Sequence, residues 1–269
     1  MEILLSRRSS VDKNILNISK SHIPQLRGIW LFLNIFAGMF DILYQDEWFI
    51  AIDKPNGLLV HRSLLAHDES PFILQLLHDQ IGKYLYPVHR LDRPTSGVLL
   101  FAFDKQTARL LSEQLISKTI RKEYIALVRG WVTEAILNER PVKNDRGNLQ
   151  EASTLFTPIT HYSLDLPLDE YAQQRYTLMS CRPHTGRWHQ IRQHLSQLRH
   201  YIINDRVHGN NKHNKLFKET LRIEPFFLHA HQLHLIHPHT KKELHIEAPI
   251  PVHFTQFIQN EKTQTITNI

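Results

Sequence analysis

The sequence has almost no cysteine and no long apolar run, and each shortage excludes a class of protein. Cys181 is the only cysteine among 269 residues, so the chain can form neither an intrachain disulfide nor a thiolate metal cluster. This usage fits a reducing compartment, and we expect a cytoplasmic protein. The apolar stretch IWLFLNIFAGMF (29–40) is shorter than the ~20 residues that span a membrane, so we expect no membrane association.

A coherent set of metal ligands is also missing. Five of the nineteen histidines cluster at His229, His231, His234, His237 and His239. Their spacing is not accompanied by the carboxylate or thiolate partners that complete a zinc site. We therefore predict no metal. The chain also contains no internal repeat and no low-complexity segment.

What the sequence does have is positive charge, with a formal net charge of +6. Nine Lys or Arg residues lie between positions 181 and 222, against only Asp205 and Glu219. A solvated basic face would also account for this charge. However, Trp188, Tyr201 and Phe217 are interleaved with the cations, and aromatic faces stack on bases while cations bind phosphates. The composition therefore favours a nucleic-acid partner.

Strands outnumber helices in the hydrophobic pattern and mix with them irregularly. We expect a strand–turn–strand at 41–54, a helix starting at Ser70–Pro71, and a helix capped by Asp104. Further strands are expected at 98–103, 123–131 and 175–183, and a helix from 188 to 198, whereas 138–170 is loop-rich. This order predicts an α+β fold rather than regular βαβ winding.

The chain divides into three parts by composition. Residues 1–38 are expected to be a poorly ordered N-terminal extension, or the product of an upstream start with Met39 as the true first residue. Residues 39–260 show no linker and are expected to form one folded domain. Residues 261–269 are expected to be a C-terminal tail.

The stretch HRLDRPTSGVLLFA (89–102) places Asp92 between Arg90 and Arg93, directly before an apolar strand. An Asp at such a turn is most often a cap that accepts backbone N–H groups. The stretch HTGRWHQIR (184–192) argues for a second role, because it supplies further arginines that would keep a buried carboxylate ionised. An ionised Asp in a basic cleft is a plausible nucleophile.

Five segments, in the same order, resemble the RluA-type pseudouridine synthases, and the similarity covers about residues 39–250. The segments are DKPNGLLVH (53–61), HRLDRPTSGVLLFA (89–102), RKEYIALVRG (121–130), RPHTGRWHQIRQHL with HYIINDRVHG (182–209), and LHAHQLHLIHP (228–238). Within that family, residues 40–55 and the HRLD stretch are most similar to the TruC-type members, which isomerise uridine-65 of tRNA.

The resemblance implies a fold, a reaction and a partner. The fold would be a single catalytic domain with a mixed, mainly antiparallel sheet, flanking helices and a central RNA-binding cleft. The reaction would be the isomerisation of uridine to pseudouridine in RNA, with tRNA as the substrate and no cofactor. We expect a monomer. The alternatives are a ribosomal RNA synthase of the same family and a non-catalytic RNA-binding protein on the same fold.

The resemblance also implies roles for individual residues. Asp92 would be the nucleophile, attacking either C1′ of the ribose or C6 of the ring. Arg192 would be its ion-pair partner, with Arg187 as second choice for that role or as a phosphate ligand. Tyr124 would stack on the uracil or relay a proton. Arg90 would fill the space of the flipped base, or simply pair with Asp92. The further RNA contacts expected are His89, Lys54 and His61.

Two positions depart from the family pattern. Asn204 stands where relatives have Gly, and His208 stands where they have Tyr. We expect neither departure to touch the chemistry, although both would alter how the substrate docks.

Overall fold

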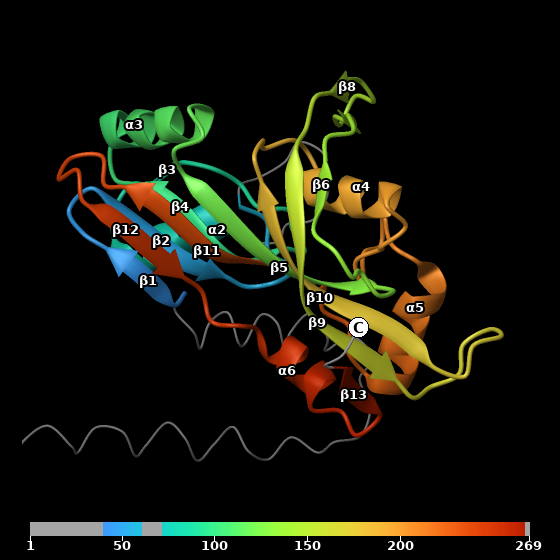
Figure 1. Cartoon of the computed structure of the whole chain (residues 1–269). Coiled ribbons are helices and arrows are strands. Elements are labelled where there is room, and N and C mark those ends of the chain that lie inside the picture. The colour runs from blue at the N-terminus through green and yellow to red at the C-terminus, as the bar shows by residue number, and fades with distance from the viewer. Residues whose placement is uncertain (1–39, 61–71, 267–269) are drawn as a thin grey trace, which may run out of the picture. The chain divides into compact units, whose positions relative to one another are not determined.

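The computed structural model describes residues 40–60 and 72–266, and one mixed sheet runs through them (Figure 1). The eleven strands of that sheet are β1 Ile42–Gln45, β2 Phe49–Lys54, β3 Tyr86–Pro87, β4 Ser96–Ala102, β5 Arg121–Arg129, β6 Ile136–Asn138, β9 Thr154–Leu164, β10 Gln174–Pro183, β11 Leu228–Ile236, β12 Glu243–Glu247 and β13 Thr263–Ile266. Strands β7 Val142–Lys143 and β8 Leu149–Gln150 form a separate hairpin.

The strand order is β1-β2-β4-β11-β5-β10-β9-β13, with β3, β12 and β6 attached to β4, β11 and β9. Among the described pairs only β4 and β11 run parallel, so the sheet is mixed and mainly antiparallel, as the sequence predicts. The helices are α2 Ile73–Ile81, α3 Lys105–Ile116, α4 Gln190–Gln197, α5 Asn211–Leu216, the π-helical turn η1 Phe217–Leu221, and α6 Val252–Ile258. Helix α3 contacts β3 and β4, whereas α4 contacts β7 and β10 (Figure 1). The predicted α+β class is therefore confirmed.

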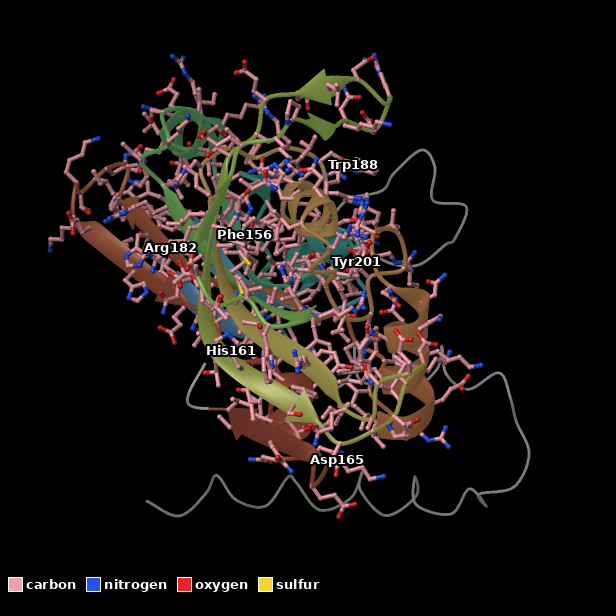
Figure 2. All side chains as sticks on the ribbon, turned by 45° about the vertical axis from the view of Figure 1, so that its right-hand side comes forward. Phe156, His161, Asp165, Arg182, Trp188 and Tyr201 are labelled. Atoms are coloured by element: carbon pink, nitrogen blue, oxygen red, sulfur yellow. The ribbon has the colours of Figure 1, made fainter. Side chains whose placement is uncertain are left out.

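Each half of the sheet packs its own apolar cluster. Around β2, β4 and β11 the cluster contains Phe49, Leu100 and Leu111 of α3. Around β5, β9 and β10 it contains Phe156, which lies in the interior in Figure 2, and Tyr176. Each fully buried apolar side chain stabilises the fold by about 1.5–3 kcal/mol. The two clusters meet at the neighbouring strands β4, β11 and β5, and their packing holds these strands in place. The loops that adjoin these strands carry the site described below.

Several local predictions are confirmed. The turn between β1 and β2 is closed by Asp46, which accepts hydrogen bonds from the amides of Trp48 and Phe49. Asp104 caps α3, accepting from the amide of Thr107 at 2.8 Å. A helix is present after position 72, but its predicted start at Ser70–Pro71 lies outside the described residues.

Two predictions are wrong. The region 138–170, which lacks a clear pattern, contains the eleven-residue strand β9. Its Pro158 lies at a bulge opposite Leu178 and Met179, where a missing N–H is tolerated. Thr263–Ile266, which we placed in the C-terminal tail, pairs with β9 as β13, because its threonines and isoleucine are β-branched. The other domain boundaries stay predictions.

No helix in residues 40–60 and 72–266 is long and apolar enough to cross a membrane.

The parallel contact between β4 and β11 depends on a glycine. Gly97 has φ +109°, and a Cβ at this position would overlap the carbonyl of Ala230 on the paired strand. We expect Gly97→Ala to lower the free energy of unfolding by about 3 kcal/mol or more, from backbone strain and collision together. Urea denaturation measures this loss.

Gly147→Ala is the matched control for that experiment. Gly147 also has a positive φ (+85°), but a Cβ there would meet open space. Its loss should be about 1–2 kcal/mol, from backbone conformation alone. Equal losses in the two variants would contradict the close approach of β4 to β11.

Candidate active site

A cavity of about 1010 Å³ opens between the turn that carries Asp92, the exposed end of β5 and the turn before α4. Six cations and two carboxylates line it: Arg90, Lys118, Arg121, Lys122, Arg182 and Arg187 against Asp92 and Asp145. Figure 2 marks two lining residues from different elements, Arg182 at the end of β10 and Trp188 before α4. The excess of positive charge suits a polyanionic ligand.

Asp92 occupies a tight turn before β4, closed by a hydrogen bond from the Thr95 amide to the Asp92 carbonyl. Its side chain is 21% exposed, and its Oδ2 accepts from Nη1 of Arg192 at 3.0 Å. The Nε2 atom of His189 lies 3.7 Å from the same oxygen. The described part of the chain offers no hydrogen-bond donor to Oδ1. The carboxylate is therefore anchored through one oxygen, which leaves the other available to a ligand.

Arg192 links Asp92 to a second carboxylate. Its Nε and Nη2 donate to Oδ2 and Oδ1 of Asp205, both at 2.7 Å. Oδ1 of Asp205 also accepts from the amides of Val207 and His208. Burial alone would raise the pKa of Asp205, but the hydrogen bonds and charge of Arg192, with the two amides, lower it overall. Asp205 thus fixes the guanidinium of Arg192 through Nε and Nη2, and the remaining nitrogen, Nη1, points toward Asp92.

Lys54 stabilises the turn that carries Asp92 through hydrogen bonds to its backbone carbonyls. Its side chain is fully buried, and Nζ donates to the carbonyls of Pro55, Arg93 and Thr95 at 2.9, 3.0 and 2.8 Å. Burial lowers its pKa to about 7, while the charge of Asp92 opposes this shift. The three carbonyl acceptors match the three N–H donors of the ammonium form, so these contacts favour the charged form against the effect of burial. Our expectation that Lys54 contacts RNA is therefore wrong, because its donors are used inside the protein.

His189 is the N-cap of α4 and has φ +51°, an unusual backbone conformation for a residue other than glycine. Its ring stacks on Trp188 with centroids 3.8 Å apart, and its Nδ1 lies 3.0 Å from Nε2 of His208. Burial lowers the pKa of His189 to about 4, and the positive charge of Arg192 adds to the effect against Asp92. The imidazole is therefore neutral near pH 7.

Tyr124 and His89 line the same cavity and are held in their neutral forms. Burial raises the pKa of Tyr124 well above its usual value, and the charge of Asp92 adds to the shift. Burial lowers the pKa of His89 to about 3, with Lys122 contributing. The Nε2 atom of His89 accepts from the amide of Leu100 at 3.2 Å, so this ring is tied to β4.

Arg90 and Arg187 are exposed at the cavity wall. The Nε atom of Arg187 donates to the carbonyl of Glu151 at 3.1 Å. The ion-pair partner of Asp92 is Arg192 rather than Arg90, so the simple pairing considered for Arg90 is wrong. The expected contact at His61 lies outside the described residues.

The basic segment 181–222 does not form one continuous face. Arg182 and Arg187 line the cavity and Arg192 is buried. The lysines after position 210 instead form surface ion pairs: Lys212 with Asp169, Lys215 with Glu219 and Lys218 with Glu224. The sequence count therefore overstates the charge that faces the cavity.

The family model for RNA pseudouridylate synthase matches residues 48–197. The chain belongs to the RNA pseudouridylate synthase family. Members of this family isomerise uridine in RNA to pseudouridine, so the resemblance found in the sequence is confirmed at the level of the family and the reaction.

Individual relatives support the family assignment. A protein from Vibrio cholerae named tRNA pseudouridine synthase C is 41% identical over 78% of this chain and 91% of its own length. The Salmonella typhi protein of the same name is 40% identical over 78% of this chain and 85% of its own. Among solved structures, human RNA pseudouridylate synthase domain containing 4 has a TM-score of 0.63 at 25% identity, covering 89% of this chain and 98% of its own. Human RNA pseudouridylate synthase domain containing 1 has the same TM-score at 22% identity, covering 79% and 84%, and shows the fold.

Sequence reasoning missed the contributions of Asp205 and His208. We expected the departures at Asn204 and His208 to lie away from the chemistry, yet His208 contacts His189, which faces Asp92. Asn204 has φ +63° and so keeps the conformation that a glycine would adopt there. The pairing of Arg192 with Asp205 could have been predicted from the short spacing between this arginine and an acidic residue in the loop that follows α4.

The buried Lys54 allows a direct test of its role. We expect Lys54→Met to lower the free energy of unfolding by about 3 kcal/mol, because three buried carbonyls lose their donor. The free energy is measured by urea denaturation at pH 7, and RNA affinity by filter binding. The matched control is Arg121→Met, which removes an exposed cation of the cavity wall. That variant should weaken RNA binding and keep its stability, and the reverse pattern would show that Lys54 contacts RNA.

The Arg192–Asp205 pair predicts how stability depends on pH. Because the folded pKa of Asp205 is lowered, its contribution is present above the unfolded pKa of ~3.9 and is lost as pH falls through the folded pKa. We expect Asp205→Asn to cost about 3 kcal/mol at pH 7. The difference from wild type should shrink between about pH 4 and pH 2, measured by urea denaturation at each pH.

Asp169→Asn is the control for this experiment, because Asp169 pairs with Lys212 on the surface, with both side chains more than half exposed. It should change stability by less than about 1 kcal/mol at any pH. A gap between wild type and Asp205→Asn that stays constant down to pH 2 would argue against an ionised Asp205.

Proposed function

We propose that this chain isomerises uridine-65 of tRNA to pseudouridine, acting as a monomer in the cytoplasm. The substrate is inferred from relatives of about 40% identity that are named tRNA pseudouridine synthase C. The position is inferred from the resemblance of residues 40–55 and 89–102 to the TruC-type members. The observation that carries the proposal is the Asp92 carboxylate, anchored through one oxygen in a basic cavity.

The size of the cavity supports a flipped nucleotide as the ligand. Its volume of about 1010 Å³ is at the upper end of the roughly 300–1,000 Å³ found for small-molecule sites. Since C1′ and the ring atoms are inaccessible inside a stacked helix, the uridine must leave the stack before it reacts. The cations at the cavity wall would then bind the phosphates on either side of the extruded nucleotide.

The reaction needs a nucleophile and proton transfers and nothing else. Asp92 attacks C1′ of the ribose or C6 of the ring, the N1–C1′ bond breaks, and the uracil turns. A bond then forms between C5 and C1′ and the bond to Asp92 breaks, which frees the carboxylate, while C5 loses its proton and N1 gains one. Product and substrate have the same atoms and oxidation state, so no oxidant or group donor takes part.

The remaining residues have roles that follow from their positions. Arg192 holds Oδ2 of Asp92 by a hydrogen bond, so that Oδ1 attacks. Tyr124 stacks on the uracil, and its raised pKa favours this role over that of a general base. Arg90, exposed beside Asp92, fills the space that the base leaves, since a guanidinium can stack and bind phosphate. Arg187 binds phosphate.

The chemistry is tested by replacing the nucleophile. We expect Asp92→Ala and the equally sized Asp92→Asn to reduce pseudouridine formation by at least about 10⁴-fold, because each removes the attacking carboxylate. Pseudouridine is mapped by sequencing of total RNA that has been incubated with each purified protein. Wild type and the surface variant Asp169→Asn should modify the same uridine at equal rates.

The outcomes separate the parts of the proposal. New pseudouridine at position 65 of tRNA with wild type only would support both the chemistry and the substrate. A modified uridine in ribosomal RNA would keep the chemistry and overturn the proposed substrate. RNA binding by all variants without any pseudouridine would identify a non-catalytic RNA-binding protein.

A further inference from the structure

A pair of histidines, His189 and His208, lies beside Asp92. The ring of His189 presents Nε2 to Oδ2 of Asp92 at 3.7 Å, and its Nδ1 lies 3.0 Å from Nε2 of His208. The two rings are nearly perpendicular, at 88°, with centroids 5.2 Å apart. The contact therefore joins one ring nitrogen of each histidine edge to edge, as a hydrogen bond requires.

His208 is itself held by the network around Arg192. Its backbone amide donates to Oδ1 of Asp205 at 3.0 Å, while its side chain reaches His189. Trp188 stacks on a face of the His189 ring, with an interplanar angle of 17°. His189 is thus fixed by Trp188 on its face and by His208 at its edge, which leaves little freedom for the ring to turn.

The hydrogen bond between the rings couples their tautomers. A neutral imidazole has one N–H and one lone pair, so one ring donates and the other accepts. If Nε2 of His208 donates, Nδ1 of His189 is the acceptor, and the proton of His189 is on Nε2, where it points toward Asp92. If His189 donates instead, its Nε2 turns a lone pair toward a negative oxygen. The charge on Asp92 favours the first arrangement.

We propose that His208 is a positioning residue that fixes His189 in its Nε2–H tautomer and thereby orients Asp92. The N–H dipole of His189 holds Oδ2 on the side of Arg192, and Oδ1 is left as the attacking oxygen. This inference rests on the proposed function of Asp92 as the nucleophile. It adds a second support for the carboxylate beside Arg192, through the ring of His189.

Two substitutions of His208 test this role. His208→Gln keeps an N–H donor that can reach His189, whereas His208→Phe keeps a flat ring without one. We expect His189 to be the Nε2–H tautomer in wild type and in His208→Gln, and to lose that preference in His208→Phe. Nitrogen-15 NMR of the imidazole reads the tautomer directly, and the spectrum of His189→Gln identifies the signal.

The same proteins are compared in single-turnover assays with saturating tRNA. We expect His208→Phe to lower the rate of the chemical step roughly 10-fold with unchanged RNA affinity, because the nucleophile is misoriented rather than removed. His208→Gln should retain most of the rate. A loss of structure would affect both variants and the affinity as well, so the rescue by Gln separates positioning from folding.

Three results would overturn the inference. They are an unchanged tautomer in His208→Phe, an unchanged rate despite a changed tautomer, or equal losses of rate in the Gln and Phe variants. A wild-type protein without synthase activity would instead overturn the proposed function. In that case the proposed effect of His208 on the reaction rate is overturned as well. The NMR spectra still decide whether His208 sets the tautomer of His189.

Discussion

The guanidinium of Arg192 lies between the carboxylates of Asp92 and Asp205, and the geometry of the site depends on this contact. Two N–H groups of its planar fork are fixed by Asp205, so the direction of the third toward Asp92 follows from the shape of the group. A lysine has a single nitrogen and could not hold both partners in this way. The contact also joins segments 100 residues apart in the chain, the turn before β4 and the helix α4.

The turn that carries Asp92 is held by the fold as well as by the ion pair. It leads directly into β4, whose seven residues are all buried, and the ammonium group of Lys54 ties its backbone to the end of β2. The side chain of Asn56 donates to the carbonyl of Pro94 in the same turn. The backbone of Asp92 is consequently held by its neighbours, and a shift of this residue would disturb the apolar cluster around β2, β4 and β11.

The sequence predicted those features that depend on local pattern. We could predict the buried strand β4, the helix cap at Asp104 and the motif around Asp92, because each depends on residues that lie close together in the sequence. Strand β9 was not, since Pro158 interrupts its pattern and only the partner strand β10 shows that a bulge accommodates it. Lys54 resembled a surface cation, because its three acceptors come from its neighbour Pro55 and from residues some 40 positions away. The contact between His189 and His208 likewise spans a helix and a loop.

The two carboxylates on Arg192 differ in ways that assign them different tasks. The Asp205 side chain is 1% exposed, and its oxygens accept two N–H groups from Arg192 and two from the backbone. The Asp92 side chain is 21% exposed, and only its Oδ2 has partners among the described residues. A carboxylate with all its hydrogen bonds made would have to lose several of them to attack a substrate, at a cost of about 1.5–3 kcal/mol for each charged contact. Within residues 40–60 and 72–266 no donor reaches Oδ1 of Asp92, so this carboxylate could attack without losing a hydrogen bond, which agrees with our proposal that Asp92 is the nucleophile.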